Sequence, residues 1–160
     1  MTLEENEAKK KALKAAIKKD LRPFMVELGF LPDKRPFEER GREKIGMYVR
    51  SREGYTDEVL VLWLTYGRPV FMLEFWSDQL ERMQAAWERH PYPRFHPNEM
   101  RRIYPRHRPR FSIFASEPWY GREKTVEQTI AVAKERLLEM DSFLRTGAPT
   151  THLDWLRKRA

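Results

Sequence analysis

Apolar residues recur at helical spacing in two long stretches, one near each end of the chain. In the first stretch the apolar positions are Leu13, Ile17, Leu21, Phe24 and Leu28. In the second they are Val126, Ile130, Ala133, Leu137, Met140 and Leu144. Spacings of three and four place each set on one face of a helix. The pattern therefore predicts an amphipathic helix at each end, and the alanine within the second stripe favours packing on a sheet over a coiled coil.

Local signals mark the ends of these helices. Thr2 with the Glu at position 5, and Thr125 with the Gln at position 128, form capping-box patterns that predict two helix starts. Gly29 is placed as a C-terminal cap, with Phe30 as its apolar partner. Because Pro23 interrupts the first stripe, we expect a kink or a break into two helices near residue 20.

Between the helices the apolar period changes to two, which is typical of strands. Residues 44–52 alternate apolar with polar positions, and residues 58–65 are apolar on both faces. With residues 70–76 they predict an antiparallel meander joined by short turns, one of them at Gly54. We expect a short edge strand at 35–40 and a further strand at 111–116.

Three shorter helices complete the predicted elements. One begins at Ser77 or Asp78, one or two helical turns occupy residues 97–104, and a final helix covers residues 151–159. The fold class expected is α+β, with a four- to five-stranded, mainly antiparallel sheet and the N- and C-terminal helices packed on one face. The expected core comprises Val61, Leu62, Trp63, Leu73, Phe75, Ile113, Ile130 and Leu137.

Length and composition narrow the class of protein. The 160 residues, 41% of them hydrophobic, suit a single domain spanning residues 1–160. The longest apolar run, residues 59–64, is far shorter than the roughly 20 residues of a membrane span. The chain has no cysteine, which excludes disulfides, thiolate zinc sites and cysteine nucleophiles. The N-terminus is acidic and lacks the apolar core of a signal peptide. Together with the absence of cysteine, this feature predicts a cytoplasmic protein.

The order of elements carries a family resemblance. A kinked first helix ends in Glu27-Leu28-Gly29-Phe30, and a short strand containing Phe37 follows. A β-meander, a long amphipathic helix and a short Trp-containing terminal helix complete the series. In this the chain resembles a widespread bacterial family of small domains of unknown function. The resemblance implies an α+β fold and a bacterial cytoplasmic setting, does not extend over residues 89–110, and transfers no catalytic residue.

Residues 89–110, called the arginine-rich segment from here on, hold seven arginines, one acid, no lysine and five of the eleven prolines. Nearly all of the formal net charge of +7 resides there. Arginine binds phosphate in a bidentate manner, and interleaved aromatic residues are typical of binders of single-stranded nucleic acid. The candidate binding residues are Arg89, Arg94, Arg101, Arg102, Arg106, Arg108, Arg110, Tyr92, Phe95 and Tyr104.

These features predict a non-catalytic binding protein whose partner is acidic. The partner can be nucleic acid or an acidic protein, and the sequence leaves both alternatives open. In a purely structural alternative, the arginines pair with the chain's own Glu81, Glu88 and Glu117. A further alternative is an adaptor or immunity-type protein that binds another protein and no nucleic acid.

The first helix carries a second group of basic residues: Lys9, Lys10, Lys11, Lys14, Lys18 and Lys19. A phosphate-binding surface is one interpretation of this group. A solvated helix face is the interpretation that the pattern favours, because runs of charge usually face solvent.

Catalytic chemistry has one candidate, Glu74, whose apolar neighbours in residues 70–76 would raise its pKa for general acid or base work. An ion pair with an arginine of a neighbouring strand, such as Arg50, is the alternative. Nucleotide-binding glycine motifs and the GxSxG motif are absent from the sequence, so the pattern leans away from an enzyme. Spacings of six and eleven between His90, His96 and His107 match no metal motif, and we expect no metal and no cofactor.

Overall fold

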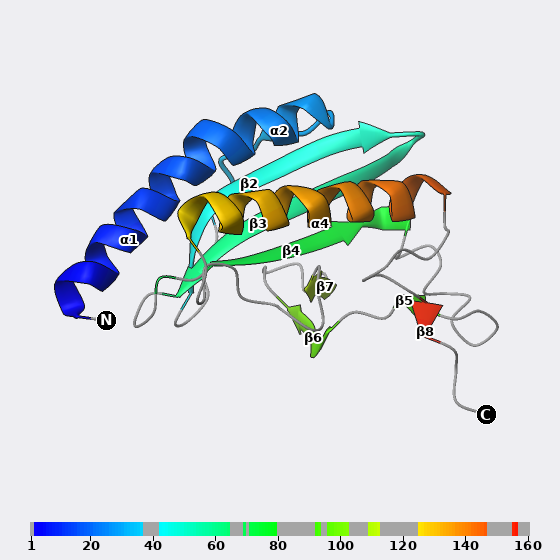
Figure 1. Ribbon diagram of the computed structural model, residues 1–160. Helices are drawn as coiled ribbons and strands as arrows, with labels where there is room; N and C mark the ends of the chain where they lie inside the picture. Colours follow the sequence, from blue (N-terminus) through cyan, green and yellow to red (C-terminus); the bar gives the residue numbers. More distant parts are fainter. Residues whose placement is uncertain are drawn as a thin grey trace.

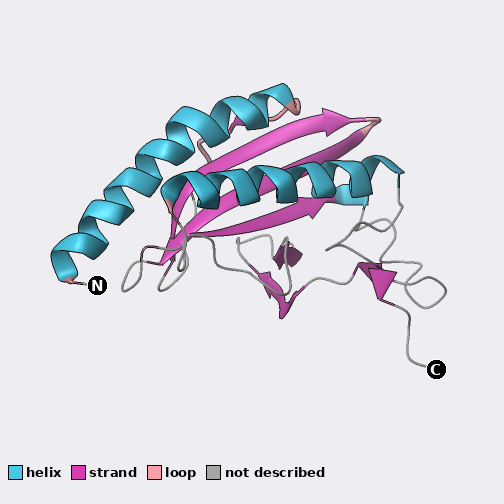
Figure 2. Cartoon of the chain, in the orientation of Figure 1, coloured by secondary structure: helices cyan, strands magenta, loops and turns pink. Residues whose placement is uncertain are grey.

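In the computed structural model, residues 2–36, 42–64, 69, 71–79, 92–93, 96–102, 109–112, 125–146 and 155–156 are described. Of these, residues 42, 64, 92–93, 96–102, 109–112 and 155–156 are described by their backbone alone. Two helical layers lie side by side on one face of an antiparallel sheet (Figure 1). Figure 2 shows the same arrangement by type of element, with helices in cyan and strands in magenta.

The N-terminal helical layer consists of α1 (Leu3–Ala16), the π-helical turn η1 (Ile17–Leu21) and α2 (Arg22–Glu27). Thr2 and Glu5 form the predicted capping box at its start. In η1 the amide of the residue at position 22 donates to the carbonyl of residue 17, five residues back. Pro23 follows at once and has no N–H to continue the α-helical pattern. The predicted interruption is therefore confirmed, and it takes the form of a π turn.

The π turn changes which residues of this layer face the core. Leu13, Ile17, Leu21 and Met25 are buried at a constant spacing of four, whereas Phe24 is half-buried. A constant spacing of four would rotate around a regular α-helix, but the extra residue absorbed by the π turn restores the alignment. The core position predicted for Phe24 thus passes to Met25.

The layer ends as the sequence predicts. Gly29 has a φ of +92°, a backbone conformation that residues with a Cβ atom rarely adopt. Its amide donates to the carbonyl of Val26, and the amide of Phe30 donates to that of Met25, which together form a Schellman motif. The Phe30 side chain is fully buried. The chain therefore turns sharply from α2 into the sheet.

Four strands form the meander: β1 (Leu31–Pro32), β2 (Arg42–Arg52), β3 (Tyr55–Leu64) and β4 (Phe71–Ser77). They pair antiparallel in sequence order, which confirms the predicted meander. Beyond β4 the backbone of β7 (Pro109–Ser112) pairs next, and β6 (His96–Arg102) follows at the edge of the sheet. A separate pair joins β5 (Tyr92–Pro93) to β8 (Trp155–Leu156).

The helix α4 (Val126–Thr146) covers the same face of the sheet as α1 and α2 (Figure 1). Thr125 and Gln128 form its predicted capping box. The main core lies between these helices and one face of β3 and β4; its members include Val61, Trp63, Leu73, Phe75, Ile130 and Leu137, as predicted. Leu62 is buried too, but on the opposite face with Met47 and Leu60. Ile113 lies outside the described residues.

Three predicted elements are wrong or displaced. The edge strand was predicted at residues 35–40, but the structure has it earlier, as β1 at residues 31–32. Residues 35–36 have no strand structure, and residues 37–40 lie outside the described residues. Helical turns were expected at 97–104, but residues 96–102 form β6. The predicted helix 151–159 is contradicted at 155–156, which form β8. In both latter cases strand pairing overrides the local helical pattern: β6 pairs with β7, the next strand in the chain, and β8 pairs with the distant β5.

Two further predicted elements are described in part. The strand expected at 111–116 begins earlier, as β7, and its residues 113–116 lie outside the description. Residues 80–91, where most of the helix after Ser77 was expected, are likewise not described. Among the helices that are described, none is both long and apolar enough to cross a membrane.

Candidate functional site

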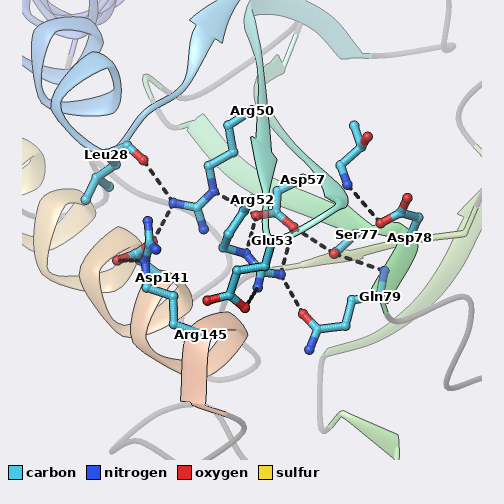
Figure 3. A network of polar contacts seen from close by, with 11 residues as sticks. Leu28, Arg50, Arg52, Glu53, Asp57, Ser77, Asp78, Gln79, Asp141 and Arg145 are labelled. Carbon is cyan, nitrogen blue, oxygen red and sulfur yellow. Dashed lines mark hydrogen bonds and ion pairs between the residues drawn. The ribbon is translucent and has the colours of Figure 1, made fainter.

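Polar side chains converge at one end of the sheet, on the face that the helices cover (Figure 3). Arg50 and Arg52 are two residues apart on β2, so their side chains point to the same face of the sheet. The register pairs Arg50 with Asp57 on β3, and Asp57 with Ser77 on β4. Side chains from three adjacent strands are thus brought into one buried cluster, which we call the Asp57 cluster.

The Asp57 carboxylate is the centre of this cluster and is 1% exposed. Its Oδ2 accepts hydrogen bonds from the Nε atoms of Arg50 and Arg52, each at 2.7 Å. Its Oδ1 accepts from Arg52 Nη2 at 3.2 Å and from Ser77 Oγ at 2.7 Å. Burial by itself would raise the pKa of Asp57, but the hydrogen bonds from Arg52, Ser77 and Arg50 outweigh it and hold the pKa below its usual range.

Arg50 connects the sheet to both helical layers. Its Nη1 donates to the carbonyl of Leu28 at 3.0 Å, at the C-terminus of α2, and also to the Asp141 carboxylate on α4. A cation at a helix C-terminus is favourable because the last carbonyls carry partial negative charge. The guanidinium also lies 4.4 Å from the ring centroid of Phe30. Arg145 Nε also donates to Asp141 Oδ1, at 3.0 Å.

Arg52 extends the cluster toward the end of β4. Its Nη2 donates to Gln79 Oε1 at 2.5 Å, and its Nη1 lies 3.6 Å from a Glu53 carboxylate oxygen. The amide of Thr56 donates to Asp78 Oδ1 at 2.8 Å. The cluster therefore fixes the chain up to residue 79, the last described residue before the arginine-rich segment begins.

The geometry assigns the Asp57 cluster a structural role. A general base must accept a proton near neutral pH, whereas two arginines keep Asp57 ionised and occupy both of its oxygens. Each charge in the buried part is also met by an opposite charge. The cluster joins β2, β3 and β4 to α2 and α4, which positions the end of β4 rigidly.

No motif in the sequence singles out Arg52, Asp57 or Ser77. A usable signal was nevertheless present in the turn Glu53-Gly54. A two-residue hairpin centred there pairs residue 52 with residue 55 and residue 50 with residue 57, so Arg50 and Asp57 become cross-strand neighbours.

Glu74 lies on β4, 4% exposed, opposite Leu60. The suggested ion pair with Arg50 is wrong, because Arg50 lies two strands away and points to the helix-covered face, where Asp57 and Asp141 are its partners. Glu74 has polar or electrostatic interactions of its own and is not an isolated carboxylate. Its neighbour on the same face, Glu58, is paired with Arg35 at 2.5 Å.

The backbone places three of the seven arginines of the arginine-rich segment. Arg101 and Arg102 lie on β6, and Arg110 lies on β7 directly opposite Arg101. Tyr92 lies on β5, where it pairs with Leu156. The other candidates fall outside the described residues: Arg89, Arg94, Phe95, Tyr104, Arg106 and Arg108.

Of the three histidines considered as metal ligands, His96 lies on β6 opposite Ser112. His90 and His107 are not described. Among the side chains that are described, no three His, Asp or Glu residues gather as a metal site.

Comparison with protein-family models finds no matching family, and comparisons with curated proteins and with solved structures find no match either.

Proposed function

We propose that this protein is a non-catalytic binding protein that engages an acidic partner through the arginine-rich segment, with nucleic acid as the partner to test first. The cysteine-free composition suits a cytoplasmic setting for this function. The proposal depends on seven arginines within 22 residues of sequence, and one structural observation supports it most directly.

That observation is the register of β6 and β7. Arg101 and Arg110 are cross-strand neighbours, and Arg102 is the next residue along β6. Like charges directly opposite each other destabilise an antiparallel pair. A polyanion that neutralises both arginines removes this repulsion, so the pairing supports a site for negative charge at this edge of the sheet.

The position of the hairpin also supports binding. In the described sheet β6 is the last strand beyond β7, at the edge farthest from β1. An edge strand presents backbone groups and side chains on its outer side to a partner. The Asp57 cluster holds the end of β4, from which the chain proceeds to this segment.

An electrophoretic mobility shift assay with single-stranded and duplex oligonucleotides tests the proposal. We expect binding at low salt that weakens steeply as salt rises, because phosphate contacts release counterions. Replacing Arg101, Arg102, Arg106 and Arg108 with Ala should abolish it. Replacing four exposed cations elsewhere, Lys18, Lys19, Arg22 and Lys34, with Ala lowers the net charge equally and should reduce binding far less.

Equal losses in the two quadruple variants would show that net charge alone drives binding, and the arginine-rich segment would not be the site. Absence of any shift at low salt removes nucleic acid as the partner. A stoichiometric protein that co-purifies with nucleic-acid-free material, and is released by the arginine substitutions, would then identify the partner as an acidic protein, in the manner of an adaptor or immunity-type protein.

A further inference from the structure

A depression lies between the helix α1 and the adjoining ends of β2 and β3. It encloses about 420 Å³ and is lined by Glu7, Lys10, Lys11, Lys14, Glu43 and Trp63. A volume of this size is within the range of small-ligand sites, roughly 300–1,000 Å³. The depression is therefore large enough for a small anion with part of its hydration shell.

Trp63 forms the floor of the depression. Its side chain is 2% exposed, and the ammonium groups of Lys10 and Lys14 lie 6.0 and 5.6 Å from its ring centroid. Lys10 and Lys14 are four residues apart and therefore share one face of α1. The Lys10 side chain is only 14% exposed, although an unrestrained lysine extends into solvent. Both ammonium groups therefore lie within cation–π distance of the indole.

The acids that face these lysines are exposed and weakly held. Lys10 lies 3.6 Å from Glu7, whose side chain is 64% exposed. Lys14 lies 3.0 Å from Glu43, and both of these side chains are nearly half exposed. Exposed ion pairs of this kind contribute about 0–1 kcal/mol, so a competing anion displaces them at little cost.

Lys11 supplies a third cation at the rim. Within the described part of the chain it forms no ion pair, and its side chain is exposed. Three ammonium groups against two carboxylates leave the depression with an excess of one positive charge. An anion with two negative charges is attracted more strongly here than one with a single charge, because it can bridge two ammonium groups at once.

We propose that this depression is a binding site for a dianionic phosphate group, held by Lys10, Lys11 and Lys14 above Trp63. The phosphate replaces the Glu43 carboxylate on Lys14 and lies between the ammonium groups of Lys10 and Lys14. The site is separate from the arginine-rich segment and does not depend on the function proposed for it. The π turn η1, which follows α1 directly, carries Lys18 and Lys19 as exposed residues, and these provide a control.

Titration with inorganic phosphate at constant ionic strength, followed by the indole N–H resonance of Trp63 in nitrogen-15 correlation spectra, tests the site. The Trp63→Phe variant identifies the resonance among the five tryptophans. We expect a saturable shift of this resonance that sodium chloride does not reproduce. Methyl phosphate should bind comparably, and dimethyl phosphate, which carries a single charge, at least several-fold more weakly.

Two variants probe the cations and the competing acid separately. Lys10→Ala with Lys14→Ala should weaken phosphate binding by about tenfold or more, whereas Lys18→Ala with Lys19→Ala should change it less than about twofold. Both double variants keep good helix formers, and circular dichroism verifies the fold. Glu43→Gln removes the competing carboxylate and should tighten binding several-fold.

Four results would overturn the proposal, the last of them its preference for a dianion. The first is a shift no larger than that caused by sodium chloride. The second is an equal loss in the two lysine double variants, which would show a diffuse effect of charge. The third is unchanged or weaker binding in Glu43→Gln, which would show that the phosphate does not take the place of this carboxylate. Equal affinity for dimethyl phosphate would overturn the preference for a dianion.

Discussion

Asp57 is the point at which the buried polar contacts meet, because four hydrogen bonds from three side chains end on its two oxygens. Arg50 and Arg52 are both buried and both depend on this one carboxylate. Removing the carboxylate that two buried guanidinium groups share is costly, because part of their charge is then left uncompensated in the protein interior. Asp57 is therefore important for stability, although the geometry does not suit it to act as a general base.

Asp57→Asn should lower the free energy of unfolding by about 3–5 kcal/mol near neutral pH. The substitution keeps the shape of the side chain but leaves two buried guanidinium groups without their shared negative charge. Urea unfolding followed by circular dichroism measures the change. Asp20→Asn, on an exposed position of η1, is the control and should change stability by less than about 0.5 kcal/mol.

The same carboxylate predicts a loss of stability in acid. The pKa of Asp57 is lowered in the folded state, so the folded protein binds its proton less readily than the unfolded chain does. The stabilisation is fully present above the unfolded pKa of about 3.9 and is lost as the pH falls through the lower folded-state pKa. The difference in stability between the natural protein and Asp57→Asn should shrink over that range. A difference that stays constant in acid would contradict the assignment.

At the scale of the elements, the β2–β3 turn contains a suboptimal residue. Glu53 and Gly54 have φ values of 50° and 81°, and Arg52 pairs directly with Tyr55 across them. Two positive φ values in a two-residue loop are those of a type I′ turn, for which Asn-Gly is the preferred sequence. A glutamate in the left-handed region of φ is strained. The Glu53 side chain is exposed where it pairs with Arg52.

Glu53→Asn should therefore raise the free energy of unfolding by about 0.5–1 kcal/mol. Gly54→Ala should lower it by about 1–2 kcal/mol, although a Cβ atom at that position would meet nothing within 4 Å. The penalty is then purely conformational. Thermal unfolding of both variants gives the comparison, and a destabilised Glu53→Asn would show that the contact with Arg52 outweighs the turn strain.

The elements differ in how far their own sequences specify them. The Thr125 capping box, the Gly29 cap and the interruption before Pro23 were all predicted correctly, because each depends on residues within one or two turns of chain. Residues 96–102 form a strand although the sequence predicts helical turns there. Pro97 suits the start of a helix, yet the segment pairs with β7, the next strand in the chain, and this pairing overrides the helix-start signal.

At the scale of the molecule, Arg50 links the sheet to both helical layers. It contacts Asp57 on β3, the Leu28 carbonyl at the end of α2, and Asp141 on α4, a residue 91 positions away in sequence. The apolar core between these layers supplies the bulk of the packing. The arginine adds directional contacts that fix how the C-terminal half of α4 is placed on the sheet.

Asp141→Asn should loosen that half of α4 while leaving the sheet intact. Loss of the charge weakens the contacts to Arg50 and Arg145, and a hydrogen bond to a charged group contributes about 1.5–3 kcal/mol. Hydrogen exchange of the backbone amides of residues 137–146 should accelerate by about tenfold or more, and β3 should change little. Glu135→Gln, on the exposed face of α4, is the matched control. Unchanged exchange rates in Asp141→Asn would show that apolar packing alone holds α4 on the sheet.

The sequence by itself determined the class of fold, the helix ends and the antiparallel meander, because these depend on periodicity, capping and turn chemistry over a few consecutive residues. It also located the arginine-rich segment, which is a property of composition. Tertiary structure alone decided how the neighbouring Arg50 and Asp57 meet Ser77, Leu28 and Asp141, and how the lysines meet Trp63. These contacts join residues that are far apart in sequence, and only strand register and helix packing bring them within contact distance.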